Sequence, residues 1–265
     1  MNPPNGVIIN YLLKNVADSA KVSVALFDQD NKLIRTYSTT GKADEKIEVK
    51  PGMNQFVWNL NYPAAEKVDG LILWNGVVGS PKAVPGNYKA VVKSESDSAA
   101  VNFTVKGDPN YKLSAKDYKD QFDFLVMTRD KFSETQKAIK EIRSIRTQVN
   151  DFVSRGKDLP KDIKDKATDI NKKITVVEET LYQTKSKSGQ DVLNFPIRLN
   201  DKLSGVFDAA NSGYAAPSKQ VKEVYAELAK QIDAELLKFK NIKDVDLKEF
   251  NELIRVKAVP VIVVK

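Results

Sequence analysis

The sequence contains neither histidine nor cysteine in its 265 residues. Their absence excludes disulfide bonds, thiolate nucleophiles, zinc sites of the usual Cys/His type, and catalytic groups that pair a serine or cysteine with histidine. No apolar run approaches the ~18 residues needed for a membrane-spanning helix. The first residues, Met1–Gly6, lack the basic start and apolar stretch of a signal peptide. Two interpretations remain: a cytosolic protein, or a fragment of a longer exported one.

The charge is mixed, with 42 basic and 35 acidic side chains and a net charge of +7. A nucleic-acid-binding protein is expected to concentrate its basic residues in one patch, and this sequence intersperses them with acids. One basic stripe is spaced along a predicted helix, but Glu134 and Glu141 interrupt it and no aromatic side chain lies beside it. We interpret the stripe as a solvated helix face, formed by Lys137, Lys140, Arg143 and Arg146.

The composition changes near Gly107. Charged residues number 22 among the first 107 positions and 55 among the remaining 158, and eight of the 12 glycines lie in the first part. Glycine-rich turns favour a β domain, whereas a high charge density with periodic apolar residues favours amphipathic helices. The sequence therefore predicts a β domain over residues 1–107, a helical domain over 108–257 and a C-terminal strand over 258–265.

The first part predicts an immunoglobulin-like β-sandwich. About seven short runs of strand-forming residues alternate with turn residues, as in small antiparallel sandwiches. Proline and glycine stand between the runs, where they supply turns without interrupting a strand. The runs lie at residues 7–13, 22–26, 33–37, 56–60, 71–74, 88–92 and 101–105.

The second part predicts an up-and-down bundle of four or five helices. Ser114 and Asp117 resemble a capping box at the start of a helix that extends to about Ser154. From Ile163 to Thr184, seam residues recur alternately four and three positions apart, which predicts a packed helix seam. Further helices are expected near residues 199–210, 221–239 and 246–255. The β-branched tail at 259–264 is expected to return to an edge of the sandwich.

Catalytic chemistry would have to rely on carboxylates, lysine or tyrosine. Asp117, Asp120 and Asp123 are three residues apart at the start of a predicted helix, where acids also complement the helix dipole. Asp28 and Asp30 faintly resemble a calcium loop, but the glycine and the distal glutamate of that loop are missing. We interpret both groups as structural. No glycine-rich phosphate-binding motif occurs, and we expect no cofactor or metal.

Two aromatic residues are candidates for contact with a ligand. Trp58 and Tyr88 lie in alternating runs and are expected in the core. Trp74 precedes Asn75 in a long connection and Tyr62 lies beside a proline, so both are less constrained. The sequence therefore predicts Trp74 and Tyr62 as possible contacts with a glycan or with a protein partner.

Several stretches together resemble the C-terminal region of large exported bacterial proteins, especially from Bacteroidetes. Those proteins carry a sialidase-like or sortilin-like β-propeller with BNR (Asp-box) repeats and are often labelled glycosyl hydrolases. The most specific element is the G-x-N-x-F-x-W-x-L-x-Y-P pattern that begins at Gly52. The matching stretches are Asn2–Val7, Pro51–Pro63, Ala83–Tyr88, Phe103–Pro109, Asp120–Phe122 and Arg129–Lys131.

This resemblance implies a setting rather than a reaction. The propeller, where such a family would place its catalytic groups, is not in this chain, so no catalytic residue is carried over. The expected function is that of a non-catalytic accessory module that packs against the propeller or another protein, in the periplasm, at the cell surface or secreted. The alternative is a carbohydrate-binding module that uses exposed aromatics, and a stand-alone enzyme is a third class. No nucleic-acid partner is expected.

Overall fold

The structure is a computed structural model that describes residues 4–14, 20–74, 78–95, 97–156 and 158–259. Contacts within the chain divide it into two compact units. The strand unit consists of residues 1–64, 80–124 and 213–216, and the helix unit of residues 65–79, 125–212 and 217–265. Each unit therefore combines separate stretches of chain, whereas the predicted domains are continuous.

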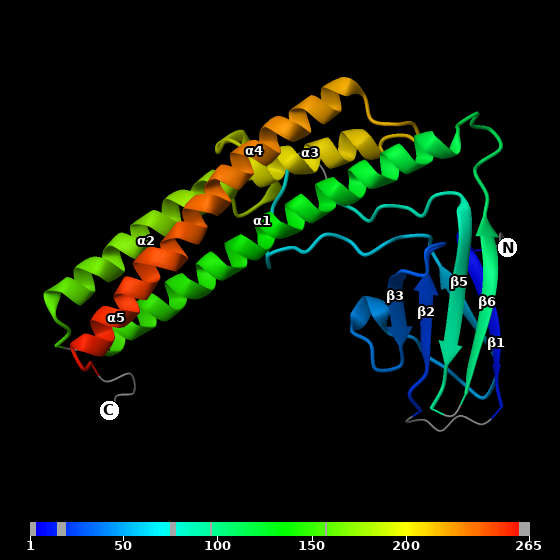
Figure 1. Cartoon of the computed structure of the whole chain (residues 1–265), viewed down its shortest axis with the longest axis horizontal. Helices are drawn as coiled ribbons and strands as arrows, with labels where there is room; N and C mark the ends of the chain where they lie inside the picture. The colour runs from blue at the N-terminus through cyan, green and yellow to red at the C-terminus, as the bar shows by residue number, and fades with distance from the viewer. Residues whose placement is uncertain (1–3, 15–19, 75–77, 96, 157, 260–265) are drawn as a thin grey trace. The chain divides into compact units, whose positions relative to one another are not determined.

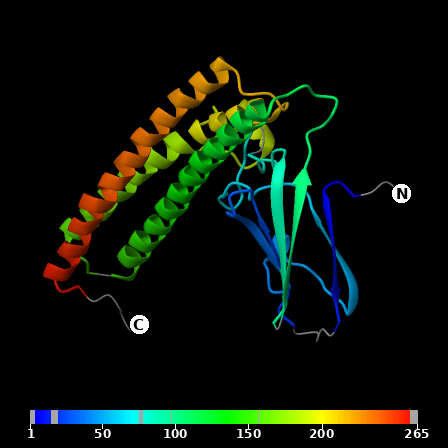
Figure 2. The same ribbon diagram turned by 45° about the vertical axis from the view of Figure 1, so that its right-hand side comes forward.

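The strand unit contains two antiparallel sheets, which confirms the prediction of a β-rich first part. A two-stranded sheet pairs β1 with β4, and a four-stranded sheet has the order β3–β2–β5–β6 (Figure 1). Figure 2 shows β1 in a different layer from the strands of the larger sheet. The strands are β1 (Val7–Leu13), β2 (Ser23–Phe27), β3 (Leu33–Ser38), β4 (Gly52–Trp58), β5 (Gly86–Lys93) and β6 (Ser98–Val105).

One hydrophobic cluster draws side chains from both sheets. Ile9 of β1 and Trp58 of β4 are buried together with Leu26 of β2 and Tyr88 of β5. The rings of Trp58 and Tyr88 meet edge to face, with their centroids 5.4 Å apart. Because side chains alternate along a strand, burial of every second residue places these groups on one face of each sheet. The two sheets therefore share one core.

The turn after β4 holds Trp58 in place. The indole Nε1 of Trp58 donates a hydrogen bond to the carbonyl oxygen of Asn61 at 3.2 Å. The Oδ1 atom of Asn59 accepts a hydrogen bond from the N–H of Asn61 at 3.1 Å, and Leu60 between them has a φ of 64°. A positive φ is uncommon for a leucine, and the asparagine hydrogen bond helps to stabilise the turn. The residues that carry the resemblance thus build the core and its turn.

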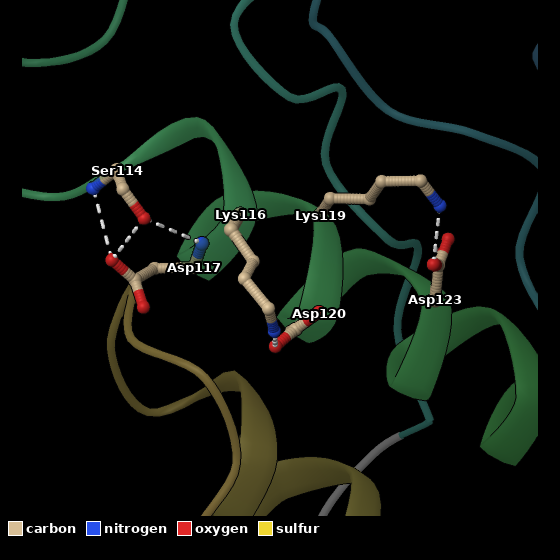
Figure 3. A network of polar contacts seen from close by, with 6 residues as sticks. All are labelled: Ser114, Lys116, Asp117, Lys119, Asp120 and Asp123. Carbon is tan, nitrogen blue, oxygen red and sulfur yellow. Dashed lines mark hydrogen bonds and ion pairs between the residues drawn. The ribbon is translucent and has the colours of Figure 1, made fainter.

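The second part is helical, as predicted. The helix from 115 is opened by the predicted capping box: the N–H and Oγ–H of Ser114 donate to Oδ2 of Asp117 at 2.9 and 2.7 Å, and the N–H of Asp117 donates to Oγ of Ser114 at 3.2 Å (Figure 3). A short 3₁₀ turn occupies Gly189–Leu193, and another, Ala43–Glu45, lies in the strand unit. The α-helices are α1 (Ala115–Arg155), α2 (Lys161–Leu181), α3 (Leu199–Asn211), α4 (Lys219–Asn241) and α5 (Lys248–Val256).

The predicted apolar seam of α2 is buried within the helix unit. Helix α2 packs against α4 and α5, and Figures 1 and 2 show α2 and α4 side by side. Thr184, the last residue of the predicted seam, lies beyond the end of the helix. The apolar seam residues within α2 are all buried: Ile163, Ala167, Ile170, Ile174, Val177 and Leu181.

The predicted fourth and fifth helices are joined without a loop. A π-helical turn, Ile242–Leu247, connects α4 directly to α5. Because a π turn contains more residues per hydrogen-bonded ring than an α-helix, it changes which side of the helix the following residues face. In this turn the carboxylate of Asp246 lies within 3.1 Å of Lys166 Nζ and within 2.8 Å of Lys173 Nζ. The turn therefore ties α4 and α5 to α2.

Two predicted strands have different outcomes. The run Leu71–Trp74 forms no strand, which corrects the prediction, and it belongs to the helix unit instead. At the C-terminus, Ala258 has a φ of 52°, and the N–H groups of Ala258 and Val259 donate to the carbonyl oxygens of Arg255 and Ile254. These hydrogen bonds form a Schellman motif that ends α5. The rest of the predicted tail strand, residues 260–264, lies outside the described residues.

We expect Ile174→Ala to destabilise the helix unit by about 2–5 kcal/mol, because Ile174 is fully buried and the shorter side chain leaves a cavity. Urea denaturation, monitored by far-ultraviolet circular dichroism, measures the change in the free energy of unfolding. Val176→Ala on the same helix is the matched control, since Val176 is 55% exposed. Equal losses for the two variants would contradict burial of the α2 seam.

Candidate functional site

An extended segment, residues 65–74, is bound to the helices by its backbone. The N–H of Glu66 donates to Ser133 Oγ at 3.1 Å, and the N–H of Val68 donates to Gln136 Oε1 at 3.2 Å. Backbone donors that are buried outside regular structure need such acceptors. Gln136 supplies such an acceptor from a fully buried position on α1, whereas the hydrogen bond to Ser133 is exposed.

Trp74, a predicted ligand contact, stands at the end of this segment. Its N–H donates to Oδ2 of Asp201 in the first turn of α3 at 2.9 Å, and the Asp201 side chain is buried. The Trp74 residue itself remains 49% exposed. The structure therefore fixes the backbone of Trp74 on α3 and leaves part of its side chain accessible.

Tyr62, the other predicted contact, has a different environment in the strand unit. It packs against the shared core, and its ring meets the ring of Phe122 edge to face with centroids 4.7 Å apart. The hydroxyl of the neighbouring core residue Tyr88 donates to the carbonyl oxygen of Val84 at 2.8 Å. The ring of Tyr62 is thus in contact with other side chains of the strand unit.

Trp74 and Tyr62 belong to different compact units, so they do not form one site within either unit. Their roles as ligand contacts stay predictions. The polar anchors Ser133, Gln136 and Asp201 were not identified as candidates from the sequence. The available signal was the position of polar residues among the apolar residues of predicted helices.

The three aspartates at the start of α1 have structural partners. Asp117 accepts the capping hydrogen bonds from the side chain and backbone of Ser114, which lower the pKa of its carboxyl. Asp120 pairs with Lys116 and Asp123 pairs with Lys119, each one turn away along the helix (Figure 3). A catalytic pair of carboxylates would face a shared reacting centre, whereas these carboxylates face a helix terminus and lysines on the same helix.

The Asp28–Asn31 segment is a hairpin turn, as interpreted from the sequence. Oδ1 of Asp28 accepts hydrogen bonds from the N–H groups of Asp30 at 3.0 Å and Lys32 at 2.9 Å, and Asn31 has a φ of 57°. These bonds use the Asp28 carboxylate to close the turn. Across the described residues, no group of three or more acidic, histidine or cysteine side chains is arranged to hold a metal ion.

The basic stripe of α1 is paired rather than fully solvated. Arg143 Nε and Arg146 Nη1 each lie 2.7 Å from a carboxylate oxygen of Glu178, which is 3% exposed. Lys137 and Lys140 lie 3.3 and 3.6 Å from the carboxylate of Glu66. The expectation of a solvated face was therefore wrong for the two arginines. Because Glu178 is on α2, helical spacing within α1 did not reveal this pairing.

A cavity of about 620 Å³ opens beside the C-terminal ends of α1 and α5. Its lining is largely apolar and includes Ile145, Phe152, Phe250 and Ile254, with Arg155 among the polar residues. The rings of Phe152 and Phe250 meet edge to face with centroids 5.8 Å apart. The cavity has the size of small-molecule sites, and its lining extends to Val259, the last described residue.

The strand unit exposes apolar side chains on the outer face of the two-stranded sheet. Leu12 of β1 lies directly opposite Met53 of β4, and they are 57% and 61% exposed. Ile8, which lies opposite Val57, is 39% exposed. We call Ile8, Leu12, Met53 and Val57 the outer apolar face.

No described helix is long and apolar enough to cross a membrane.

Comparison of the sequence with protein-family models and with curated proteins gave no match.

The buried Tyr88 makes the free energy of unfolding depend on pH, and this dependence tests the packing around Tyr62. Burial raises the pKa of Tyr88 to about 12, and burial also raises the pKa of Tyr62. An unfolded tyrosine loses its proton near pH ~10. The folded state therefore retains protons that the unfolded state releases, so the stabilisation is complete below pH ~10 and is lost as the pH rises toward the folded values.

We expect the free energy of unfolding to fall between pH 10 and 12. Tyr88 contributes to the slope of this fall by retaining up to about one proton more in the folded state than in the unfolded state. Guanidinium denaturation at several pH values measures this slope. Tyr88→Phe should reduce the slope, and Tyr111→Phe at an exposed residue is the control. Identical slopes for the parent chain and Tyr88→Phe would contradict the proposed linkage.

Proposed function

We propose that this chain is a non-catalytic accessory module of an exported β-propeller protein and that it docks on the propeller through its outer apolar face. The observation that carries the proposal is the exposure of Ile8, Leu12 and Met53 on one face of the two-stranded sheet. An exposed apolar patch on a folded protein is typical of an interaction site. The propeller as partner, and a location in the periplasm, at the cell surface or outside the cell, follow from the resemblance.

The register of β1 and β4 supports a built surface rather than scattered exposed residues. Leu12 with Met53 and Ile8 with Val57 form two apolar cross-strand pairs. Between them, Gln55 Nε2 donates to Oδ1 of Asn10 at 3.2 Å, so the intervening polar pair satisfies part of its own hydrogen bonding. Burial of such a face removes apolar area from water, which contributes about 25 cal/mol per Å².

The proposal also includes the arrangement of the sheets and of the helices. We infer that the two sheets form an immunoglobulin-like sandwich, which the core shared by Ile9, Leu26, Trp58 and Tyr88 supports. We also infer that the helices form an up-and-down bundle, which the packing of α2 on α4 and of α3 on α4 supports.

A non-catalytic role is supported by the use of the candidate acids. Asp117, Asp120 and Asp123 serve as a helix cap and as partners of lysines. Glu178, the most buried acid named above, is held by Arg143 and Arg146. Each of these carboxylates is matched to a structural partner, as expected for a module whose function lies in its surface.

We expect the complete reading frame to encode a β-propeller upstream of these residues, and the separately produced propeller to bind this chain in isothermal titration calorimetry. Leu12→Lys combined with Met53→Lys should weaken binding at least tenfold, because two charges would be buried in an apolar contact. Thr36→Lys, at an exposed residue of β3, is the control for added charge. A reading frame without a propeller, or a propeller that does not bind, contradicts the proposal.

The half-exposed Trp74 favours carbohydrate binding as the second candidate function. Its backbone is fixed by Asp201 while its side chain is 49% exposed, as a stacking platform for a sugar requires. Tyr62 contributes less, because its ring packs against Phe122 and the shared core.

For that second candidate we expect soluble plant or host polysaccharides to retard the chain in native gels. Trp74→Ala should abolish the retardation, and Tyr111→Ala, at an aromatic residue that is 51% exposed, should preserve it. Unchanged migration of the parent chain across the whole panel would contradict carbohydrate binding while leaving propeller docking to its own test.

A further inference from the structure

The free edge of the four-stranded sheet has unusual chemistry. It is formed by β6, whose eight residues pair with β5 without a shift in register. The sequence Ser98–Val105 contains no charged residue and no proline. A free edge presents unpaired backbone donors and acceptors, and proteins commonly protect such edges with lysine, proline, a bulge or a covering segment. Within the described residues, β6 has none of these.

The opposite edge of the same sheet is protected. At β3, the pairing with β2 is irregular beside Phe27, and Arg35 pairs with Glu45 at 3.1 Å. The strand also forms a bridge through Ser38 to Lys46, and the 3₁₀ turn Ala43–Glu45 contacts it. Among the residues that the structure describes, this sheet therefore has one protected edge, β3, and one open edge, β6.

The core side of β6 is open as well. Val101 lies opposite Ala90 of β5, which is buried, so Val101 is on the side of the sheet that faces the core. Nevertheless Val101 is 50% exposed, and every residue from Ser98 to Asn102 is exposed. In β1, by contrast, Ile9 and Leu13 on the core side are buried, and Val7 and Tyr11 on the same side are half-buried. An occupant of the β6 edge would therefore find both backbone groups and apolar side chains uncovered.

We infer that β6 is a self-association edge, on which β6 of a second copy of this chain adds antiparallel across a two-fold axis to continue the sheet. Such an axis is perpendicular to the sheet and keeps the core sides of both copies on the same side of it. Because side chains alternate with a period of two, each core-side residue of β6 then meets a core-side residue of its counterpart.

The sequence of β6 is complementary to itself in this arrangement. With the axis at Val101, this residue meets its own counterpart and Ala99 meets Phe103, all of them apolar, while Val105 at the end of the strand meets Asp97, which precedes the strand. On the other side, Ser98 meets Thr104 and Ala100 meets Asn102, all of them uncharged. Like charges directly opposite each other destabilise strand pairs, and none are brought together by this pairing. This self-complementarity selects a second copy as the occupant.

The charges around the edge predict the effect of salt. Lys89 and Lys93 on β5 lie opposite Asn102 and Ser98, Lys106 follows β6, and Asp97 precedes it. The balance near the edge is positive, as is the net charge of +7. Salt screens the repulsion between two such copies, so self-association should strengthen as salt rises. A contact made by lysines with an acidic partner would weaken instead.

Sedimentation velocity of the full chain tests the inference between about 5 µM and about 1 mM protein, where a single strand pair is expected to give a weak dimer with a Kd of about 10–500 µM. We expect the Kd to fall when the sodium chloride concentration is raised from about 20 to about 300 mM. Hydrogen exchange should also slow at β6 as protein concentration increases. A monomer throughout the concentration range overturns the inference.

Substitutions locate the contact. Val101→Lys, or Ala99→Lys as an independent variant, should raise the Kd at least tenfold. Both residues are exposed in the single chain, and in the dimer each would meet an apolar residue of the second copy across the axis. Thr36→Lys carries the same added charge and should leave the Kd unchanged. Leu12→Lys should also leave it unchanged, which separates this edge from the outer apolar face. A dimer that is unaffected by both Val101→Lys and Ala99→Lys overturns the assignment to β6.

Discussion

The backbone of residues 65–74 is held on the helices by three hydrogen bonds, and this constraint decides what structure the segment can adopt. The stretch has no strand or helix of its own, so its N–H groups find their acceptors on other elements. Ser133 and Gln136 of α1 and Asp201 of α3 provide them at 2.9–3.2 Å. Because the segment is committed to the helices, it adds no strand to either sheet. The smaller sheet consequently contains only β1 and β4 among the described strands.

Most of the secondary structure could be predicted from the sequence, because periodicity and turn chemistry are local. The seam of α2, the Ser114–Asp117 capping box and the hairpin turn at Asp28 were predicted from neighbouring residues and are confirmed. The prediction failed at Leu71–Trp74, where a short apolar run fits a strand and an extended segment equally well. Only the distant acceptor on Asp201 separates the two, and sequence spacing does not show it.

The candidate site was less predictable for the same reason. Trp74 was identified as a less constrained aromatic, and its 49% exposure is consistent with accessibility without testing a role. The environment of Tyr62 depends on Phe122 and Tyr88, which approach from distant parts of the chain. Likewise, the pairing of Arg143 with Glu178 joins two helices. Removing both Arg143 and Arg146 would leave the buried carboxylate of Glu178 uncompensated, so these contacts constrain how α1 and α2 meet.

The strand unit leaves two surfaces open, and they differ in how they would recognise a partner. The outer apolar face would act through side chains, so its specificity would depend on the shapes and apolarity of Leu12 and Met53. The β6 edge acts chiefly through backbone groups, which are the same for any sequence, so its specificity must come from what its side chains exclude. An eight-residue strand without charge excludes little, except that it disfavours the burial of a charged counterpart. Selection at this edge therefore rests on symmetry: an identical strand reproduces the same alternation, and apolar and uncharged residues match without further adaptation.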